Sequence, residues 1–367
     1  MKAVTLGTLL LAGIILGSQG RILRGGEPDV VRYFDQDTFD RLRSELLSRV
    51  VGSRRNADSG IVEATRWPPV SVTSNLGQVS GIAVDSHGLV YVFHRGATVW
   101  NFRSFNADNV YSQPDKFIDV PTILVLDPKS GKVLKQWGEN MFLMPHGLYI
   151  DPDDNVWATD VGLHQVFKFK ENETKPSLVL GEALVPGDDS EHFCKPTDVA
   201  VLNSGVVFIA DGYCNHRVAV FNGDGQFLTE IGRADGMLVP HSITLLDGND
   251  TLCVADRENS RILCYATGVS AEGEYGLGDM KFANADENLG KVYAIAGHGN
   301  HLYGVEMFGG GEPHAGFVTE VLESSPIQTF TPREPFVLPH DIALSPDGST
   351  IYIVDAGSKK KIYKFLA

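Results

Sequence analysis

Hydrophobic and polar positions alternate along most of the chain in short runs that are separated by turn residues. One unit has an alternating run over residues 145–151, a turn at residues 153–155, and a second run over residues 156–160. A period of two residues, bounded by Gly, Asp and Asn, is typical of β-strands that are joined by tight turns. The pattern therefore predicts an antiparallel pair of strands in this segment.

This unit recurs along the chain, with copies that begin near residues 80, 145, 196, 240, 292 and 339. A spacing of about 50 residues, with further alternating runs after the first pair, is that of a four-stranded propeller blade. We therefore expect an all-β fold, a six-bladed β-propeller over residues 66–367. The last copy ends without room for an outer strand, so residues 66–76 are expected to supply it and close the ring.

The first 65 residues differ from the repeats. Residues 1–20 place a lysine, an apolar run and small residues in the order of a secretory signal peptide. An uncleaved anchor is the alternative, but the apolar run is short for a membrane span, and no second run of that length follows. We expect a secreted chain with no membrane span once the signal is removed. Residues 21–65 are expected to form a propeptide-like helix and linker, with helical spacing of Phe39, Leu42, Leu46 and Val50.

Charge and cysteine content indicate which partners and which covalent modifications to expect. The chain has 31 Lys and Arg against 46 Asp and Glu, a net charge of −15, which makes nucleic acid a poor partner. Four cysteines in a secreted chain predict disulfides, and of the three connectivities the pairing of neighbours is the natural proposal. Two sequons permit glycosylation, and no coiled-coil pattern argues against a monomer. These residues are Cys194, Cys214, Cys253 and Cys264, and the sequon residues Asn172 and Asn249.

Three histidines occupy the same position of the repeat, directly after a proline. They are His146, His241 and His340, in the second, fourth and sixth copies. Alternate blades of a six-bladed ring are about 120° apart, so these imidazoles are expected to converge on the channel axis. Three neutral imidazoles with an open fourth position form a catalytic zinc site. The first and third copies carry Ser80 and Thr197 at this position, so the fold itself does not require histidine.

Asp341 follows the last of these histidines directly. A carboxylate on the channel wall, near inward-turned backbone carbonyls such as those of Ile82 and Leu148, offers hard oxygen ligands that suit calcium. The sequence thus indicates a calcium site beside the histidines.

Two arginines and a tyrosine follow the ends of second strands, on the face where the histidines lie. Arg95 and Arg257 align with each other in the first and fourth copies, and Tyr213 belongs to the third. Two guanidinium groups near a metal suit a substrate that carries a carboxylate. A phenol beside cations loses its proton more readily and can serve as a base.

Eight segments of the chain form long and ordered motifs. They are Gly77–Gly81, Phe93–Gly96, Pro145–Leu148, Thr159–Lys168, His192–Val201, Asp211–Asn215, Val254–Asn259 and Pro339–Ile342. Through these motifs the chain resembles the peptidyl-α-hydroxyglycine α-amidating lyases over about residues 70–366. Where the family carries a Met two residues before the last zinc histidine, this chain has Leu338, which leaves the wall of the pocket apolar.

The resemblance implies a secreted, single-function lyase that cleaves a peptidyl-α-hydroxyglycine into a peptide α-amide and glyoxylate. It implies disulfides between cysteines that are neighbours in the sequence. It also implies a hydroxylating monooxygenase that supplies the substrate in neuropeptide processing. Its pattern assigns zinc to His146, His241 and His340, calcium to Asp341 with the carbonyls of Ile82 and Leu148, catalysis to Tyr213 and Arg257, and the substrate carboxylate to Arg95.

Two alternatives share the propeller architecture. Calcium-dependent lactonases and esterases build their metal site from Asp, Glu and Asn, which does not account for three axial histidines. Non-enzymatic binding propellers with NHL repeats share the blade pattern of Asp211, Asn215 and Arg217, but have no reason to place histidine in alternate blades.

Overall fold

The computed structural model describes residues 14–16, 22–24, 60–246, 248–269, 276–286, 289–309, 313–321 and 327–367. The chain divides into two compact units, Met1–Ala57 and Asp58–Ala367. In the first unit, β1 (Ile14–Leu16) pairs antiparallel with β2 (Ile22–Arg24). The predicted helix around residues 39–50 and most of the predicted signal peptide lie outside the described residues. Among the described helices, none is long and apolar enough to cross a membrane.

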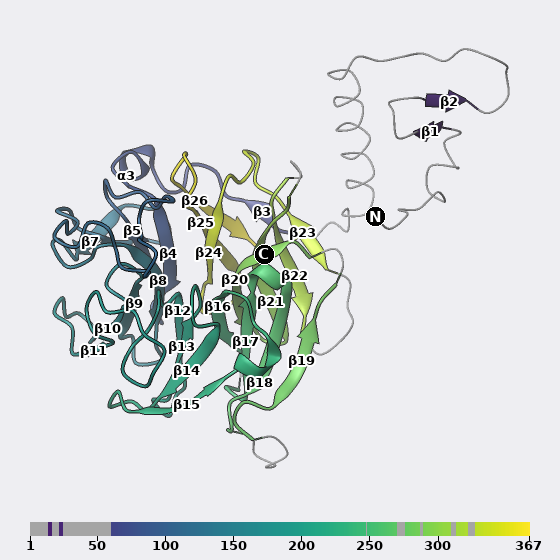
Figure 1. Cartoon of the computed structure of the whole chain (residues 1–367). Helices are drawn as coiled ribbons and strands as arrows, with labels where there is room; N and C mark the ends of the chain where they lie inside the picture. Colours follow the sequence, from purple (N-terminus) through teal and green to yellow (C-terminus); the bar gives the residue numbers. More distant parts are fainter. Residues whose placement is uncertain are drawn as a thin grey trace. The chain divides into compact units, whose positions relative to one another are not determined.

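The second unit is an all-β ring of six four-stranded antiparallel sheets, which confirms the predicted six-bladed propeller. Inner strands of consecutive blades contact one another, and β24 contacts β4, so the ring is closed. In Figure 1 the six inner strands lie around the centre of the unit. These inner strands are β4 (Val79–Val84), β8 (Pro145–Ile150), β12 (Asp198–Val201), β16 (Pro240–Leu245), β20 (Lys291–His298) and β24 (Pro339–Leu344).

In each sheet the inner strand is paired in order with a second, a third and an outer strand. The second strands are β5 (Val90–His94), β9 (Val156–Asp160), β13 (Val207–Asp211), β17 (Thr251–Asp256), β21 (His301–Met307) and β25 (Thr350–Asp355). The third strands are β6 (Ile123–Leu126), β10 (Gln165–Phe169), β14 (Arg217–Phe221), β18 (Arg261–Ala266), β22 (Ala315–Glu320) and β26 (Lys361–Leu366). The outer strands of the first five blades are β7 (Val133–Trp137), β11 (Leu178–Leu180), β15 (Phe227–Ile231), β19 (Met280–Asn284) and β23 (Gln328–Phe330).

The outer strand of the sixth blade corrects one prediction. It is β3 (Val62–Glu63), which pairs with β26, and not residues 66–76. Pro68 and Pro69 have no backbone N–H to donate to a sheet, and the short helix α3 (Val70–Thr73) follows them. Because β3 lies upstream of residue 66, the propeller begins earlier in the sequence than we expected.

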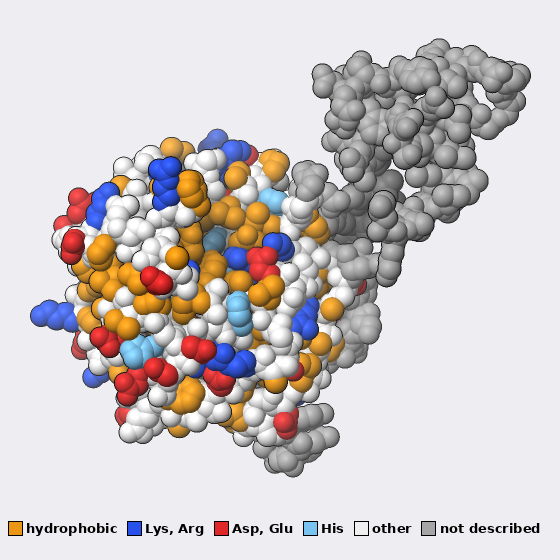
Figure 2. Space-filling view, in the orientation of Figure 1, with side chains coloured by type: hydrophobic (Ala, Val, Ile, Leu, Met, Phe, Trp, Pro, Cys, Tyr) orange, Lys and Arg blue, Asp and Glu red, His pale blue; other side chains and the backbone are white. Residues whose placement is uncertain are grey.

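Hydrophobic side chains fill the spaces between neighbouring blades. One cluster joins Trp157 and Val166 of the second blade to Val199 and Ile209 of the third. Sheets that pack face to face around a ring bury both faces of each blade, which explains why their strands carry apolar residues at successive positions. Figure 2 shows hydrophobic side chains gathered around a hollow on one face of the molecule.

Both predicted disulfides are present. Cys194–Cys214 connects the segment before β12 to the loop after β13, and Cys253–Cys264 joins directly paired residues of β17 and β18. There is no free cysteine in the described part of the chain. The first bridge fixes the loop that carries Tyr213, next to Cys214.

Candidate active site

In every blade but the third, a bulge near the start of the inner strand interrupts the pairing with the second strand. In the fourth blade Pro240 pairs with Asp256 and Ser242 pairs with Ala255, so His241 is an extra residue without a partner in β17. A bulge interrupts the alternation of a strand and re-aims the side chain at that position. Similar shifts occur in the first, second, fifth and sixth blades, at Ser80, His146, Tyr293 and His340.

In the second, fourth and sixth blades, a buried aspartate at the end of the second strand holds the loop that leads to the histidine. In the second blade Asp160 accepts hydrogen bonds from the backbone N–H groups of Leu143 and Met144, directly before Pro145. Asp256 likewise accepts from the backbone of Leu238, and Asp355 accepts from Val337 and Leu338. These recurring aspartates thus fasten turns.

The three predicted histidines come together on the channel axis. The ring centroids of His146, His241 and His340 form a nearly equilateral triangle with sides of 4.8, 4.8 and 4.9 Å. All three side chains are buried. One potential ligand atom from each lies within 4.8 Å of the others, which is the arrangement expected for alternate blades.

Backbone carbonyls of the neighbouring blades fix the orientation of these imidazoles. In each case Nδ1 faces a carbonyl oxygen, which can only accept, so Nδ1 carries the proton and Nε2 keeps its lone pair. Such outer contacts are typical of metal-binding histidines. The Nδ1–O distances are 2.8 Å from His146 to Thr197, 2.6 Å from His241 to Tyr293 and 2.7 Å from His340 to Ser80.

The histidines are uncharged at neutral pH. Burial, together with the charges of Arg95 and Arg257, lowers the pKa of His340 to about 3. Burial likewise lowers the pKa of His146 and of His241 well below the ordinary value, and neighbouring arginines and histidines act in the same direction. The neutral imidazole is the form that binds metal ions.

Tyr213 lies directly against this triangle. Its hydroxyl group is 3.1 Å from Nε2 of His146 and 3.2 Å from Nε2 of His241, and it donates its one proton to either of these unprotonated nitrogens. Nη1 of Arg257 donates to the same hydroxyl oxygen at 3.4 Å. The hydroxyl oxygen of Tyr213 therefore contacts Arg257, its predicted catalytic partner, and two of the predicted zinc ligands.

Two aromatic rings and a carboxylate hold Arg257 in place. Its guanidinium carbon is 5.2 Å from the ring centroid of Tyr213 and 4.9 Å from that of Tyr293. Glu258 accepts a hydrogen bond from Nε at 3.0 Å and also forms an ion pair with Lys291. Burial alone would lower the pKa of Arg257, but Tyr213, Tyr293 and Glu258 raise it overall, so the group remains charged.

Arg95 enters the site from the first blade. Its Nε donates to the carbonyl of Pro145 at 2.8 Å, beside His146. Burial lowers the pKa of Arg95 to about 10, which still leaves it charged at neutral pH. The ring of Trp100 lies 4.9 Å from that of Tyr213 and 5.3 Å from the Arg95 guanidinium carbon, and closes this side of the site.

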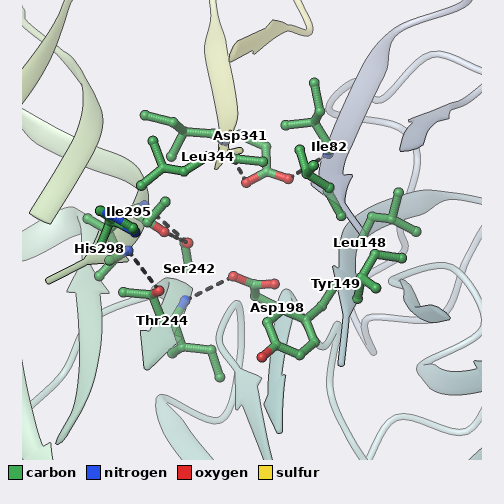
Figure 3. Close-up of a pocket in the computed structure, with 18 of the residues that line it drawn as sticks. Ile82, Leu148, Tyr149, Asp198, Ser242, Thr244, Ile295, His298, Asp341 and Leu344 are labelled. Atoms are coloured by element: carbon green, nitrogen blue, oxygen red, sulfur yellow. Dashed lines mark hydrogen bonds between the residues drawn. The ribbon is translucent and has the colours of Figure 1, made fainter. Parts of the chain in front are cut away.

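The predicted calcium residues line a second part of the channel (Figure 3), a cavity of about 240 Å³. Asp341 accepts a hydrogen bond from the backbone N–H of Ile82 at 2.8 Å, and Leu148 lies on the same wall. Asp198 also points into this cavity, and its carboxylate accepts from the backbone of Ile243. Burial raises the pKa of both carboxyl groups, and the charge of Asp198 raises that of Asp341 further.

The sequence did not single out Tyr293, Trp100 or Asp198 as site residues. Tyr293 occupies the histidine position of the fifth blade, but that copy lacks the preceding proline and is too degenerate to reveal it. Trp100 lies in the long connection between β5 and β6, and the wide spacing between the first and second copies signals that insertion. Asp198 aligns with Asp341 in the repeat, and that alignment could have revealed a second carboxylate.

Three segments of the chain match the NHL repeat family, over residues 142–169, 193–221 and 238–265. They coincide with the inner three strands of the second, third and fourth blades. Among solved structures, a gluconolactonase from Xanthomonas campestris is similar with a TM-score of 0.52 and 11% identity, over 83% of this chain and 97% of that one. At this identity the likeness concerns the fold alone.

Curated relatives match at much higher identity. Peptidyl-alpha-hydroxyglycine alpha-amidating lyase 2 of Drosophila melanogaster is 39% identical, over 82% of this chain and 74% of its own length. Peptidyl-glycine alpha-amidating monooxygenase of Mus musculus is 42% identical, over 84% of this chain and 32% of its own length. The chain thus spans about a third of the length of that monooxygenase.

Proposed function

The chain belongs to the family of peptidyl-α-hydroxyglycine α-amidating lyases, and on this basis we propose that it cleaves a peptidyl-α-hydroxyglycine into a peptide α-amide and glyoxylate. The observation that carries the proposal is the position of the Tyr213 hydroxyl group, within 3.2 Å of Nε2 in two of the three neutral, axial imidazoles. A lyase of this kind needs a base beside an electrophilic centre. Tyr213 would be the base, and a metal ion held by the imidazoles would be the electrophilic centre.

The three histidines fit zinc. Their side chains are buried and neutral, and each has its Nδ1 bound to a carbonyl, which leaves three Nε2 lone pairs for one cation. A zinc ion held by these imidazoles would supply Lewis acidity toward the hydroxyl group of the substrate.

The substrate is a carbinolamide, whose C–N bond breaks when its hydroxyl group loses a proton. Tyr213, as the phenolate, accepts that proton, and the O–H electron pair becomes the second C–O bond of glyoxylate. The C–N electron pair leaves with the amide nitrogen, which takes the proton back from Tyr213. Arg257 stabilises the phenolate, because its charged Nη1 lies 3.4 Å from the phenol oxygen.

Arg95 binds the carboxylate of the hydroxyglycine in this scheme. The guanidinium is buried, charged and next to the histidines, through its bond to Pro145. A buried cation of this kind favours an anionic ligand, since an unpaired buried charge is unfavourable.

The second cavity fits calcium through its oxygen donors. The carboxylate of Asp341 and the backbone carbonyls of Ile82 and Leu148 are hard ligands, and Asp198 adds negative charge across the same cavity. Desolvated carboxylates facing one space favour a cation between them. We propose that this ion stabilises the ring.

The setting that we propose is the secretory pathway. The two disulfides suit an oxidising compartment, and the apolar residues 3–16 suit a signal peptide.

We propose that Asn172 and Asn249 are glycosylation sites and that the enzyme is a monomer. A peptidylglycine hydroxylating monooxygenase would supply the substrate.

Glyoxylate release from a small N-acyl-α-hydroxyglycine tests the function. The purified chain should release glyoxylate, a chelated sample should lose the activity and regain it with zinc, and His146→Ala should reduce kcat/KM at least a hundredfold. His87→Ala is the matched control, because the side chain of His87 is 72% exposed, and it should behave like the unchanged protein.

Two results would contradict the proposal. A folded, zinc-loaded chain that hydrolyses lactones and releases no glyoxylate would indicate a lactonase. A chain that emerges from dialysis without metal and without activity, and gains none with zinc, would indicate a binding scaffold.

A further inference from the structure

Gln78 lies directly before β4 and contacts two residues of the site, Arg95 and Trp100. Its backbone carbonyl accepts the N–H of Arg95 at 2.9 Å. Its side-chain Oε1 accepts from Nη1 of Arg95 at 3.0 Å and from the backbone N–H of Trp100 at 2.9 Å. One amide oxygen therefore holds both the cation of the first blade and the first part of the insertion between β5 and β6.

The contacts of Arg95 leave one nitrogen for a ligand. Nε donates to Pro145 and Nη1 to Gln78, whereas Nη2 is buried and has no hydrogen-bond partner among the described residues. Both groups that accept from Arg95, the Pro145 carbonyl and the Gln78 amide, are uncharged. A buried donor on such a cation is unfavourable unless a ligand accepts from it.

Trp100 depends on the same amide. Its backbone N–H is fixed by Gln78, and its indole ring packs against Tyr213 and lies 5.3 Å from the guanidinium carbon of Arg95. The ring also lies 6.1 Å from that of His146. A shift of Gln78 would therefore move the cation and the aromatic wall together.

The chemistry of the amide is suited to this task. A neutral acceptor orients Arg95 without cancelling its charge, whereas a carboxylate at the same place would form an ion pair with it. We propose that Gln78 is a positioning residue that orients Arg95 and Trp100 for substrates with a free carboxylate on the hydroxyglycine carbon. This inference rests on the proposed lyase function.

The test compares two substrates, an N-acyl-α-hydroxyglycine and its neutral carboxamide, with the release of the acyl amide followed by chromatography. In Gln78→Glu, KM for the carboxylate substrate should rise roughly 10- to 100-fold, and KM for the carboxamide should change less than about threefold. Gln136→Glu is the matched control, because Gln136 is exposed on β7 of the same blade, and it should change neither value.

Gln78→Met removes the acceptor without adding charge, and serves if Gln78→Glu does not fold. It should raise KM for the carboxylate substrate more than for the carboxamide, and weaken calorimetric binding of glyoxylate, which involves no turnover. Equal changes in KM for both substrates, or no change for either, would overturn the proposal. An unchanged protein that cleaves neither substrate would instead refute the lyase function itself.

Discussion

The two parts of the channel use neighbouring positions of the same repeat for different chemistry. Around the axis, His146, His241 and His340 present nitrogen ligands beside two arginines and Tyr213. In the cavity of Figure 3, Asp198 and Asp341 present carboxylate oxygens. The first part suits a borderline-soft ion with an open position, and the second suits a hard ion.

The bulge explains how two such sites fit so close together. His340 and Asp341 are consecutive, and in a regular strand their side chains would point to opposite faces. Because the register shifts between Pro339 and Asp341, the alternation is interrupted and both side chains reach the channel. Loss of one site therefore need not remove the other.

The largest expected effect concerns Tyr213. Replacing it with Phe removes the proposed base and keeps the ring against Trp100, so kcat should fall roughly 10²- to 10⁴-fold while KM changes little. Steady-state kinetics of glyoxylate release measure both values. Tyr303→Phe, on β21 of the fifth blade, should leave both unchanged. A nearly normal kcat in Tyr213→Phe would remove this residue from the mechanism.

The oxygen-lined cavity should affect stability more than chemistry. Calcium should raise the thermal midpoint of the protein by roughly 5 °C at about a hundredfold excess over Kd, because it binds only the folded state. Asp341→Asn should lose this response, and without calcium it should be no less stable than the unchanged protein, since burial disfavours the charged carboxylate. Thermal unfolding with and without calcium measures this.

The exposed turn residue Asp153 provides the control, and Asp153→Asn should keep the full calcium response. If calcium raised the midpoint of Asp341→Asn as much as that of the unchanged protein, the proposed calcium site would be wrong. If Asp341→Asn lost zinc as well, the two parts of the channel would not be separate.

The repeat made most of the fold predictable. Recurring strands and turns fixed the number of blades, and the position of histidine after proline predicted the axial cluster, because equivalent positions in a closed ring share one radius. The outer strand β3 was misplaced because two residues that pair with β26 leave almost no pattern. Local signals this short carry little information on their own.

Other site residues escaped prediction because their roles come from tertiary contacts. Trp100 acquires its role through a loop without repeat symmetry, which a sequence pattern does not place in space. Gln78 is one polar residue before a strand, and only the two hydrogen bonds of its side chain distinguish it. For Tyr293 the position in the repeat was predictable, but the residue type was not, because the other blades carry a different residue there.

The smallest expected effect concerns His164, which lies between β9 and β10 at the end of the blade where His146 begins its strand. Its side chain is buried, and Nδ1 accepts the backbone N–H of Lys195. Burial, then the charge of Lys195, lowers the pKa of His164 to about 4. The unfolded chain binds this proton first, so stability is complete above about pH 6.5 and declines as the pH falls toward 4.

Asparagine at this position should reduce the loss of stability in acid. Asn tolerates the positive φ of 59° that His164 adopts, and it does not titrate. Between pH 7 and pH 5, the thermal midpoint of metal-free His164→Asn should fall less than that of the unchanged protein, by roughly 2–4 °C. His301→Asn, at a side chain that is 48% exposed, should not reduce the loss. Because the three axial histidines and His94 are buried and have lowered pKa values as well, they should account for a remaining acid sensitivity in both proteins. Equal losses in the unchanged protein and in His164→Asn would show that His164 does not contribute, and would assign the effect to these other histidines.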